Sequence, residues 1–301
     1  PFKNKLRDQI SERFSSLPRG VSPGPSGERY EHLRAVADTS VGMHALTELS
    51  MLVADAQWDP GMRACRLTAL FKEEPLPAPA VTPIRPVTTG EASRRHTGSS
   101  MVAVAKAKIE SLFLSFNQFS LTADGCQLIY NVARHALGDI PTWVVAALDE
   151  SSAFQLAQRP EMRRRMMQHL PELIPYFARA YDSAAALHYG DEQIPAAQSI
   201  NGCQQGCSFG TVLHGLAQMR RVQTLMAEFG DCLVLCMCDD VFVLGPPDRV
   251  AAALTRYHEL VQADHGRLNL PKSIIWSPTA ASTQHPDIQA LAGVRATPDA
   301  A

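Results

Sequence analysis

The chain has 301 residues, of which 46% are hydrophobic and 19% are charged, a composition typical of a soluble globular protein. This length allows one large domain or two ordinary ones, and no apolar run reaches the about 18 residues of a membrane span, so no membrane role is expected. The net charge of −2 provides no general argument for nucleic-acid binding. Because the sequence begins Pro1-Phe2, we expect it to be an internal piece of a longer protein.

The N-terminal part is predicted to be largely helical. Helices are expected over residues 3–16, 98–115 and 123–137, with two or three more between 28 and 71. The segment Ser22–Gly27 predicts turns, since Pro fixes φ and Gly permits positive φ. Five prolines between Pro75 and Pro86 exclude a regular helix there, and Ile84–Val87 is expected to be extended.

From residue 141 onward the pattern alternates between strands and helices. Helices are expected over 160–170, 171–181, 208–229 and 248–263, and strands over 142–148, 184–189, 193–200, 232–238, 241–245 and 272–276. Two apolar runs on either side of Asp239-Asp240 predict a tight hairpin with this pair at its turn. The residues after Ser277 are expected to be a loop-like tail. This order predicts an α+β fold in which helices pack on one face of an antiparallel sheet.

Three aspartates are candidates for metal-dependent chemistry. Asp149 ends a predicted buried strand, and Asp239 and Asp240 lie at the predicted hairpin. Transfer of a nucleotidyl group uses two divalent cations about 3.5–4 Å apart, and Mg²⁺ prefers oxygen ligands. If the hairpin lies beside the first strand, the three carboxylates converge at one edge of the sheet. The alternative is an unrelated α/β protein in which these residues are ordinary turn and cap residues.

Other polar clusters have a functional and a structural interpretation. Cys232, Cys236 and Cys238 raise the possibility of a zinc site, but no CxxC pair and no His at ligand spacing supports it, and buried cysteines in strands are the favoured explanation. The arginines Arg163–Arg165 and Arg220-Arg221 could contact template phosphates. Charge runs on helices usually face solvent, and we expect the same here.

Several segments resemble motifs of the reverse transcriptases of the non-LTR retrotransposon type. Leu148–Phe154 looks like the first palm motif, in which Phe154 would exclude the ribonucleotide 2′-hydroxyl. Gln205 and Gly206 resemble the Gln-Gly turn that contacts the incoming nucleotide and the template. Met237–Gly245 is similar to the hairpin that carries the paired aspartates. The resemblance thus implies that Asp149, Asp239 and Asp240 are the catalytic metal ligands.

The resemblance continues on both sides of these motifs. In Leu268–Ser273 it places Lys272 near the leaving phosphate. Upstream it covers Ser22–Gly27, Gln118–Gly125 and the basic residues Arg85, Arg94 and Arg95. In the family such basic residues contact the triphosphate and the template, which gives Arg85 a substrate-binding role.

Some positions depart from the family pattern. Cys238 stands where the family usually has Ala, and Met237 where it has an aromatic residue. Cys207–Phe209 replaces the expected Asp-Pro-Leu, and Pro77–Pro83 lies where a fingers hairpin is expected. None of these changes removes a metal ligand. They are nevertheless compatible with a degenerate element.

The resemblance implies a right-hand polymerase palm with a largely helical fingers region and no complete thumb. Residues 1–140 would be the fingers and N-terminal helical region, 141–276 the palm, and 277–301 a tail or the start of a thumb. The implied activity is an RNA-directed DNA polymerase that adds dNTPs to a primer 3′-hydroxyl. Its partners would be an RNA template, a DNA primer and two Mg²⁺ ions, with Mn²⁺ as a substitute, and its location intracellular and nuclear. The alternative is a catalytically silent relic that keeps the fold and some nucleic-acid affinity.

Overall fold

The computed structural model describes residues 1–72, 84–190 and 197–298 and divides the chain into two compact units. Unit 1 consists of Pro1–Lys106 and Arg159–Gly210, and unit 2 of Ala107–Gln158 and Thr211–Ala301. Each unit takes two separate stretches of chain. The physical reason is strand pairing, because the strands within Arg159–Gly210 join the sheet of unit 1.

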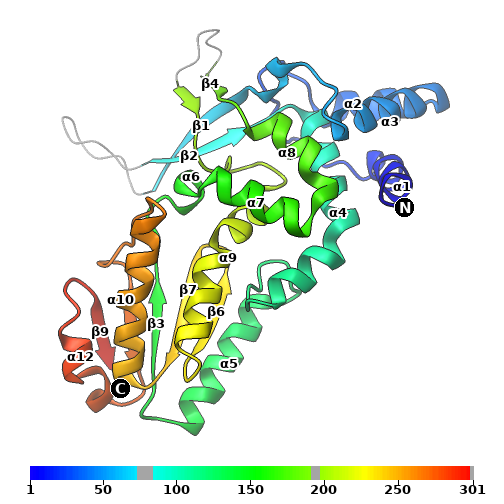
Figure 1. Ribbon diagram of the computed structural model, residues 1–301. Coiled ribbons are helices and arrows are strands. Elements are labelled where there is room, and N and C mark those ends of the chain that lie inside the picture. The colour runs from blue at the N-terminus through cyan, green and yellow to red at the C-terminus, as the bar shows by residue number, and fades with distance from the viewer. Residues whose placement is uncertain (73–83, 191–196, 299–301) are drawn as a thin grey trace. The chain divides into compact units, whose positions relative to one another are not determined.

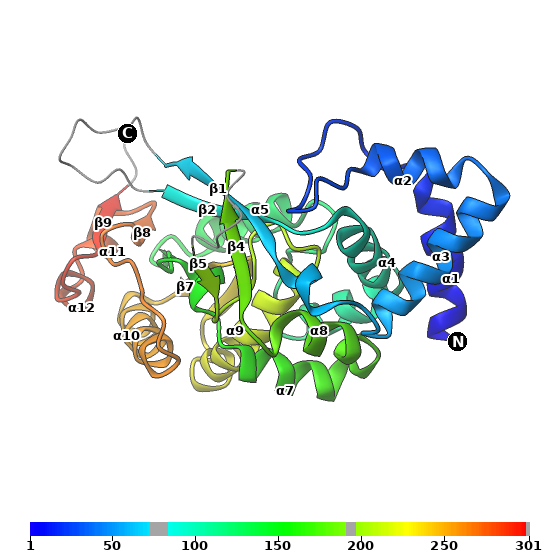
Figure 2. The ribbon, with the colours of Figure 1, turned by 90° about the horizontal axis from the view of Figure 1, so that it is seen from above.

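Unit 1 begins with three helices that pack together (Figures 1 and 2). They are α1 (Phe2–Phe14), α2 (Tyr30–Ala37) and α3 (Ser40–Ala54). In α1 the buried residues are Leu6, Ile10 and Phe14, which recur every four residues and confirm the predicted amphipathic helix. Unit 1 also contains η1 (Pro60–Arg63), α7 (Arg159–His169), η2 (Pro171–Leu173) and α8 (Ile174–Tyr181).

The sheet of unit 1 has four strands in the order β2-β1-β4-β5. Their bounds are β1 (Cys65–Phe71), β2 (Ile84–Thr89), β4 (Ala185–Tyr189) and β5 (Ala197–Ser199). The β1–β2 and β4–β5 pairs are antiparallel, whereas β1 and β4 are parallel. The two or three helices expected between residues 28 and 71 are present as α2, α3 and η1, whereas strand β1 at the end of this stretch was not expected. The expected fingers hairpin at Pro77–Pro83 lies outside the described residues.

Unit 2 contains a five-stranded sheet in the order β6-β7-β3-β8-β9. Its strands are β3 (Val144–Leu148), β6 (Leu233–Met237), β7 (Asp240–Gly245), β8 (Ile274–Ser277) and β9 (Arg295–Pro298). All neighbours are antiparallel except β8 and β9. The predicted hairpin is confirmed, but its turn is shifted by one residue. Met237 pairs with Asp240, so the turn residues are Cys238 and Asp239.

The two faces of this sheet are covered differently. The helices of unit 2 are α5 (Gly125–Asp139), α6 (Ala153–Leu156), α9 (Gly210–Glu228) and α10 (Pro247–Ala263), and α4 (Ala92–Leu114) extends from unit 1 into unit 2. Helix α10 packs on β3 and β7, where Ala146, Val241 and Val243 are fully buried. On the opposite face α5 packs its Ile129 against Leu235. An apolar groove of about 720 Å³ remains between α5 and the rest of that face.

The residues after Ser277 are not a loop-like tail. They form two short helices, α11 (Ala280–Thr283) and α12 (Pro286–Gln289), followed by strand β9. Strand β9 pairs in parallel with β8. It is therefore stabilised by a neighbouring strand, which the local sequence pattern does not reveal. The α+β class itself is confirmed. Within the described ranges, no helix is long and apolar enough to cross a membrane.

Candidate active site

Asp149, Asp239 and Asp240 lie near one another at one edge of the five-stranded sheet. Because Leu148 pairs with Val241, Asp149 at the end of β3 lies beside Asp240 at the start of β7. Burial and the negative charges of Asp239 and Asp149 raise the pKa of Asp240. A carboxyl group responds in this way when it is held near like charges and away from water. The grouping is therefore electrostatically unfavourable unless a cation is bound.

The chemistry of these side chains fits a hard divalent cation, since Mg²⁺ is usually held by one or two carboxylates and by substrate phosphates. Neither Asp149 nor Asp240 forms an ion pair with a basic residue of the described ranges. However, no three His, Cys, Asp or Glu side chains among the described residues are arranged to hold a metal ion. The site thus supplies the ligand types for Mg²⁺ without a closed protein cage.

A cavity of about 400 Å³ opens beside the carboxylates. Its walls carry Asp149, Asp240 and two basic residues, Lys272 and Arg295. Lys272 precedes β8, and Arg295 lies on β9 opposite Ile274. Sequence reasoning missed Arg295, because it lies in the stretch expected to be a tail. Carboxylates and cations that face one cavity suit a ligand that has both metal-binding and anionic groups.

The turn that carries Asp239 has an unusual backbone. Cys238 has a φ of 53°, in the left-handed region, which costs about 1–2 kcal/mol for a residue with a Cβ. The side chain of Gln118 holds it there with two hydrogen bonds. The Cys238 N–H donates to Gln118 Oε1 at 2.9 Å, and Gln118 Nε2 donates to the Cys238 carbonyl at 2.9 Å. Sequence reasoning noted Gln118 only as part of a longer segment.

Phe154 lies on α6, and its ring stacks on His214 with the ring centroids 4.7 Å apart. His214 is 1% exposed, and burial together with the charge of Arg221 lowers its pKa to about 3. The imidazole is therefore neutral at neutral pH, which suits a ring packed face to face with an aromatic side chain. The residues lining the cavity beside Asp149 do not include Phe154. No sequence signal pointed to His214.

Gln205, Gly206 and Arg85 belong to unit 1. The backbone N–H and the hydroxyl of Thr88 donate to the Gln205 carbonyl at 2.8 and 2.9 Å. Gly206 has a φ of 100°, and a Cβ there would lie 2.3 Å from the Thr88 carbonyl oxygen. The Gln-Gly turn is thus fixed against β2, the strand on which Arg85 is exposed.

Arg94, expected to contact a triphosphate, is buried and only 3% exposed. Its guanidinium donates to Gln204 Oε1 at 3.0 Å and to the sulfur of Cys65 at 3.2 Å. It also donates to the carbonyls of Met62 and Arg63. In this conformation the Arg94 guanidinium is bound to Gln204, in the segment before the Gln-Gly turn.

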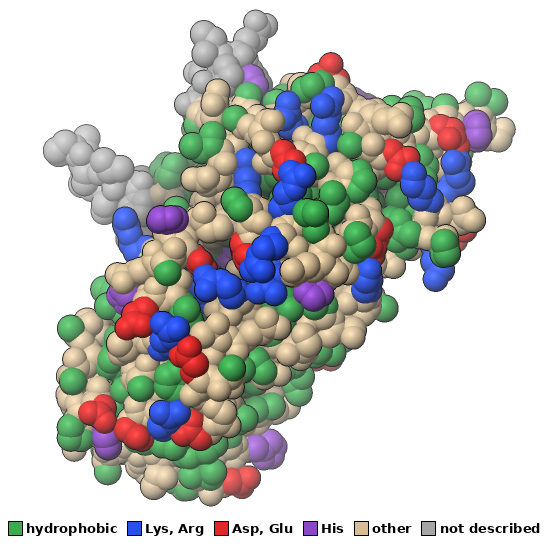
Figure 3. Space-filling model, in the orientation of Figure 1, with side chains coloured by type: hydrophobic (Ala, Val, Ile, Leu, Met, Phe, Trp, Pro, Cys, Tyr) green, Lys and Arg blue, Asp and Glu red, His purple; other side chains and the backbone are tan. Residues whose placement is uncertain are grey.

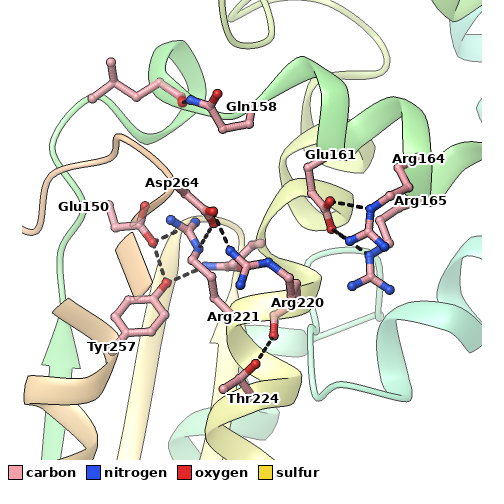
Figure 4. A network of polar contacts seen from close by, with 12 residues as sticks. Glu150, Gln158, Glu161, Arg164, Arg165, Arg220, Arg221, Thr224, Tyr257 and Asp264 are labelled. Carbon is pink, nitrogen blue, oxygen red and sulfur yellow. Dashed lines mark hydrogen bonds and ion pairs between the residues drawn. The ribbon is translucent and has the colours of Figure 1, made fainter. Parts of the chain in front are cut away.

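The two arginine runs differ in their surroundings. Arg163 and Arg164 are exposed and form ion pairs with nearby carboxylates, which agrees with the expected solvated face, whereas Arg165 is half-buried beside Glu161. For Arg221 that expectation is wrong, since this residue is 5% exposed. It forms an ion pair with Glu150 at 3.1 Å within a buried network (Figure 4). A helix pattern could not reveal this partner, because Glu150 lies on another part of the chain.

Models of known protein families and curated protein sequences show no match to this chain. Solved structures do. The chain is similar to telomerase from Candida albicans in complex with the TWJ fragment of telomeric RNA, with a TM-score of 0.52 and 10% identity. That match covers 72% of this chain and 42% of the other.

A second similar structure is apo telomerase from Candida tropicalis, truncated from its C-terminal domain. Its TM-score is 0.51 with 10% identity, and the match covers 72% of this chain and 50% of the other. The chain therefore spans half or less of the telomerase chains that it matches. At this identity the likeness concerns the fold alone: the chain has a mixed α+β fold similar to that of these telomerase structures.

Proposed function

We propose that this chain is the core of a reverse transcriptase that adds dNTPs to a primer 3′-hydroxyl on an RNA template. The observation that carries the proposal is the grouping of Asp149, Asp239 and Asp240 at one edge of the five-stranded sheet. The telomerase-like fold supports it, as does the RNA fragment bound in one of the similar structures. Assignment to the non-LTR retrotransposon type rests on the motif resemblance.

The three carboxylates would hold two Mg²⁺ ions, with Mn²⁺ as a substitute. In two-metal sites, bound ions activate the attacking hydroxyl and stabilise the leaving oxygen. The protein's own contribution is to fix the carboxylates on the end of β3 and on the β6–β7 turn. Lys272, which lines the same cavity as Asp149 and Asp240, would face the phosphates of the nucleotide.

The remaining site residues would bind the substrates. Phe154 would select deoxynucleotides by excluding a 2′-hydroxyl, and its stack on His214 supports a fixed orientation of the ring. Gln205 and Gly206 would position the nascent base pair, and Arg85 would contact phosphates. The hydrogen bonds from Thr88 support a rigid Gln-Gly turn in that role.

Primer extension on an RNA template with dNTPs tests the proposal. The wild-type chain is compared with an Asp239→Asn, Asp240→Asn double variant, in Mg²⁺ and in Mn²⁺. Asp139→Asn, which changes an exposed carboxylate at the end of α5, is the matched control. We expect extension by the wild type and the control, and its loss in the double variant.

A catalytically silent relic is the second candidate. Two observations favour it. Among the described residues no three His, Cys, Asp or Glu side chains are arranged to hold a metal ion, and Cys238 stands where the family usually has Ala. On this hypothesis, no variant extends a primer with either cation. Retained affinity for an RNA–DNA hybrid without extension would support the relic, and extension that depends on the aspartates would exclude it.

A further inference from the structure

A chain of polar side chains runs through the interior of unit 2, from the β6–β7 turn to the residue after Asp149. It begins with the two hydrogen bonds between Gln118 and the backbone of Cys238. Gln118 Nε2 also donates to Gln218 Oε1 at 3.1 Å, and Gln218 Nε2 donates to the Tyr257 hydroxyl at 3.4 Å. The Tyr257 hydroxyl donates to the Glu150 carboxylate (Figure 4).

The side chains that form this series are buried. Gln118, Gln218 and Tyr257 are 0% exposed, and Glu150 is 7% exposed. Arg221 closes the far end, since it forms an ion pair with Glu150 and its guanidinium lies 5.7 Å from the centre of the Tyr257 ring. Water cannot replace a lost partner in such a place, so each hydrogen bond constrains its neighbours.

The two ends of this hydrogen-bonded series of side chains are adjacent to the candidate metal ligands. Glu150 directly follows Asp149, and Cys238 directly precedes Asp239. The carboxylates of Asp149, Asp239 and Asp240 carry like charges, and their repulsion favours separation of the β6–β7 turn from the end of β3. A bonded chain that spans the interior between these two places opposes that separation.

We propose that Gln118, Gln218 and Tyr257 are positioning residues that couple the conformation of the Asp239 turn to the end of β3. Gln118 holds Cys238 in its left-handed conformation, and the Tyr257 hydroxyl connects this series of hydrogen bonds to the Glu150 carboxylate. The coupling itself is a property of the fold of unit 2. Only its consequence for catalysis rests on the proposed polymerase function.

The decisive variant is Tyr257→Phe, which removes the bridging hydroxyl and leaves the ring in place. Tyr176→Phe is the matched control, because Tyr176 is equally buried but its hydroxyl donates to the Arg94 carbonyl in unit 1. Hydrogen exchange of the segment around Cys238 is followed in the full chain. We expect exchange to rise about 3- to 30-fold in Tyr257→Phe and to stay unchanged in the control.

Binding of Mn²⁺, measured by electron paramagnetic resonance, provides a second readout that needs no polymerase activity. We expect weaker Mn²⁺ binding in Tyr257→Phe, by about 3- to 30-fold, and wild-type binding in Tyr176→Phe. Gln118→Glu removes the donor to the Cys238 carbonyl and should raise exchange at the turn directly. If Tyr257→Phe does not fold, Gln218→Met interrupts the same chain and takes its place.

The outcomes separate the coupling from the proposed function. Unchanged exchange in Tyr257→Phe, with raised exchange in Gln118→Glu, would mean that the turn is held locally, and the coupling would be wrong. A wild-type chain that extends no primer, but whose turn and Mn²⁺ affinity respond to Tyr257→Phe, would confirm the coupling and contradict only the polymerase proposal.

Discussion

Two residues next to the candidate site have backbone conformations that L-amino acids rarely adopt. Cys238 and Ser152 have φ angles of 53° and 54°, and they lie beside Asp239 and close to Phe154. Such conformations cost about 1–3 kcal/mol each and persist only where surrounding contacts enforce them. For Cys238 those contacts are the two hydrogen bonds between its backbone and the Gln118 side chain. Backbone strain of this kind is concentrated at functional sites.

Gly206→Ala should destabilise the protein. The φ of 100° is unfavourable for alanine, and the added Cβ would lie 2.3 Å from the Thr88 carbonyl oxygen, so the turn must move away from β2. We expect a loss of about 1–3 kcal/mol in the free energy of unfolding, measured by urea denaturation. Gly138→Ala in helix α5 is the control, since a Cβ there meets no atom within 4 Å. It should stabilise by about 0.5–1 kcal/mol, and equal effects of the two variants would contradict the prediction.

His96 should contribute to acid denaturation. It is fully buried against Phe14, and burial together with the charge of Arg13 lowers its pKa to about 4. The unfolded chain therefore binds the proton first, so stability is present above about pH 6.5 and is lost as the pH falls toward 4. His96→Phe removes the titrating group and keeps an aromatic ring beside Phe14.

The measurement is the free energy of unfolding between pH 4 and pH 6.5. We expect the slope of stability against pH to fall by up to about 1.4 kcal/mol per pH unit in His96→Phe. His44→Phe, at an exposed position of α3, is the control and should leave the slope unchanged. An unchanged slope in His96→Phe would show that His96 binds its proton equally well in both states.

At the scale of elements, local patterns were not sufficient for the short helices α6, α11 and α12, but they were sufficient for the longer helices and for the β6–β7 hairpin. Their apolar residues recur with the period of the element, as in α1, or flank a tight turn. Strands β1 and β9 were missed, because β1 is completed by strands from other parts of the chain and β9 pairs in parallel with β8. A short strand of this kind has no periodicity long enough to be recognised.

The packing of α1 provides a test at this scale. Ile10 is fully buried on the face that α1 turns toward the rest of unit 1. Truncation to alanine leaves a cavity, so Ile10→Ala should lower the free energy of unfolding by about 2–5 kcal/mol. Asp8→Ala changes the exposed face of the same helix and should stay within about 0.5 kcal/mol of the wild type. Thermal and urea denaturation measure both, and equal effects would mean that α1 is not anchored by this face.

At the scale of the whole chain, the surface charges are mixed. On the face shown in Figure 3, basic and acidic side chains are interspersed, in keeping with a net charge of −2. Nucleic-acid affinity depends on how many phosphates basic residues neutralise, and this number also sets its salt dependence. A chain with this charge balance should therefore neutralise few phosphates.

Binding of a fluorescent RNA–DNA hybrid should consequently weaken only moderately with salt. For about two to three phosphate contacts, we expect a loss of about 10- to 40-fold in affinity between 50 and 200 mM salt, measured by fluorescence anisotropy. Lys272→Ala should reduce the slope of log affinity against log salt concentration by about 1, the contribution of one phosphate contact. Lys3→Ala on α1 should leave this slope unchanged. A loss of about 10³-fold or more would indicate a basic interface that the charge balance does not reveal.

Local sequence patterns indicate which residue types could carry the chemistry and predict most of the elements that bear them. The strands that flank Asp149, Asp239 and Asp240 and the α+β class follow from local apolar patterns, and the motif resemblance points to the three aspartates as candidate ligands. The tertiary structure alone decided how the chain divides into two interleaved units, that Arg221 is buried and that Arg295 lines the carboxylate cavity. It also decided that Gln118 holds the turn at Cys238. The physical reason is that these features depend on contacts between residues far apart in the sequence, which no local period or propensity encodes.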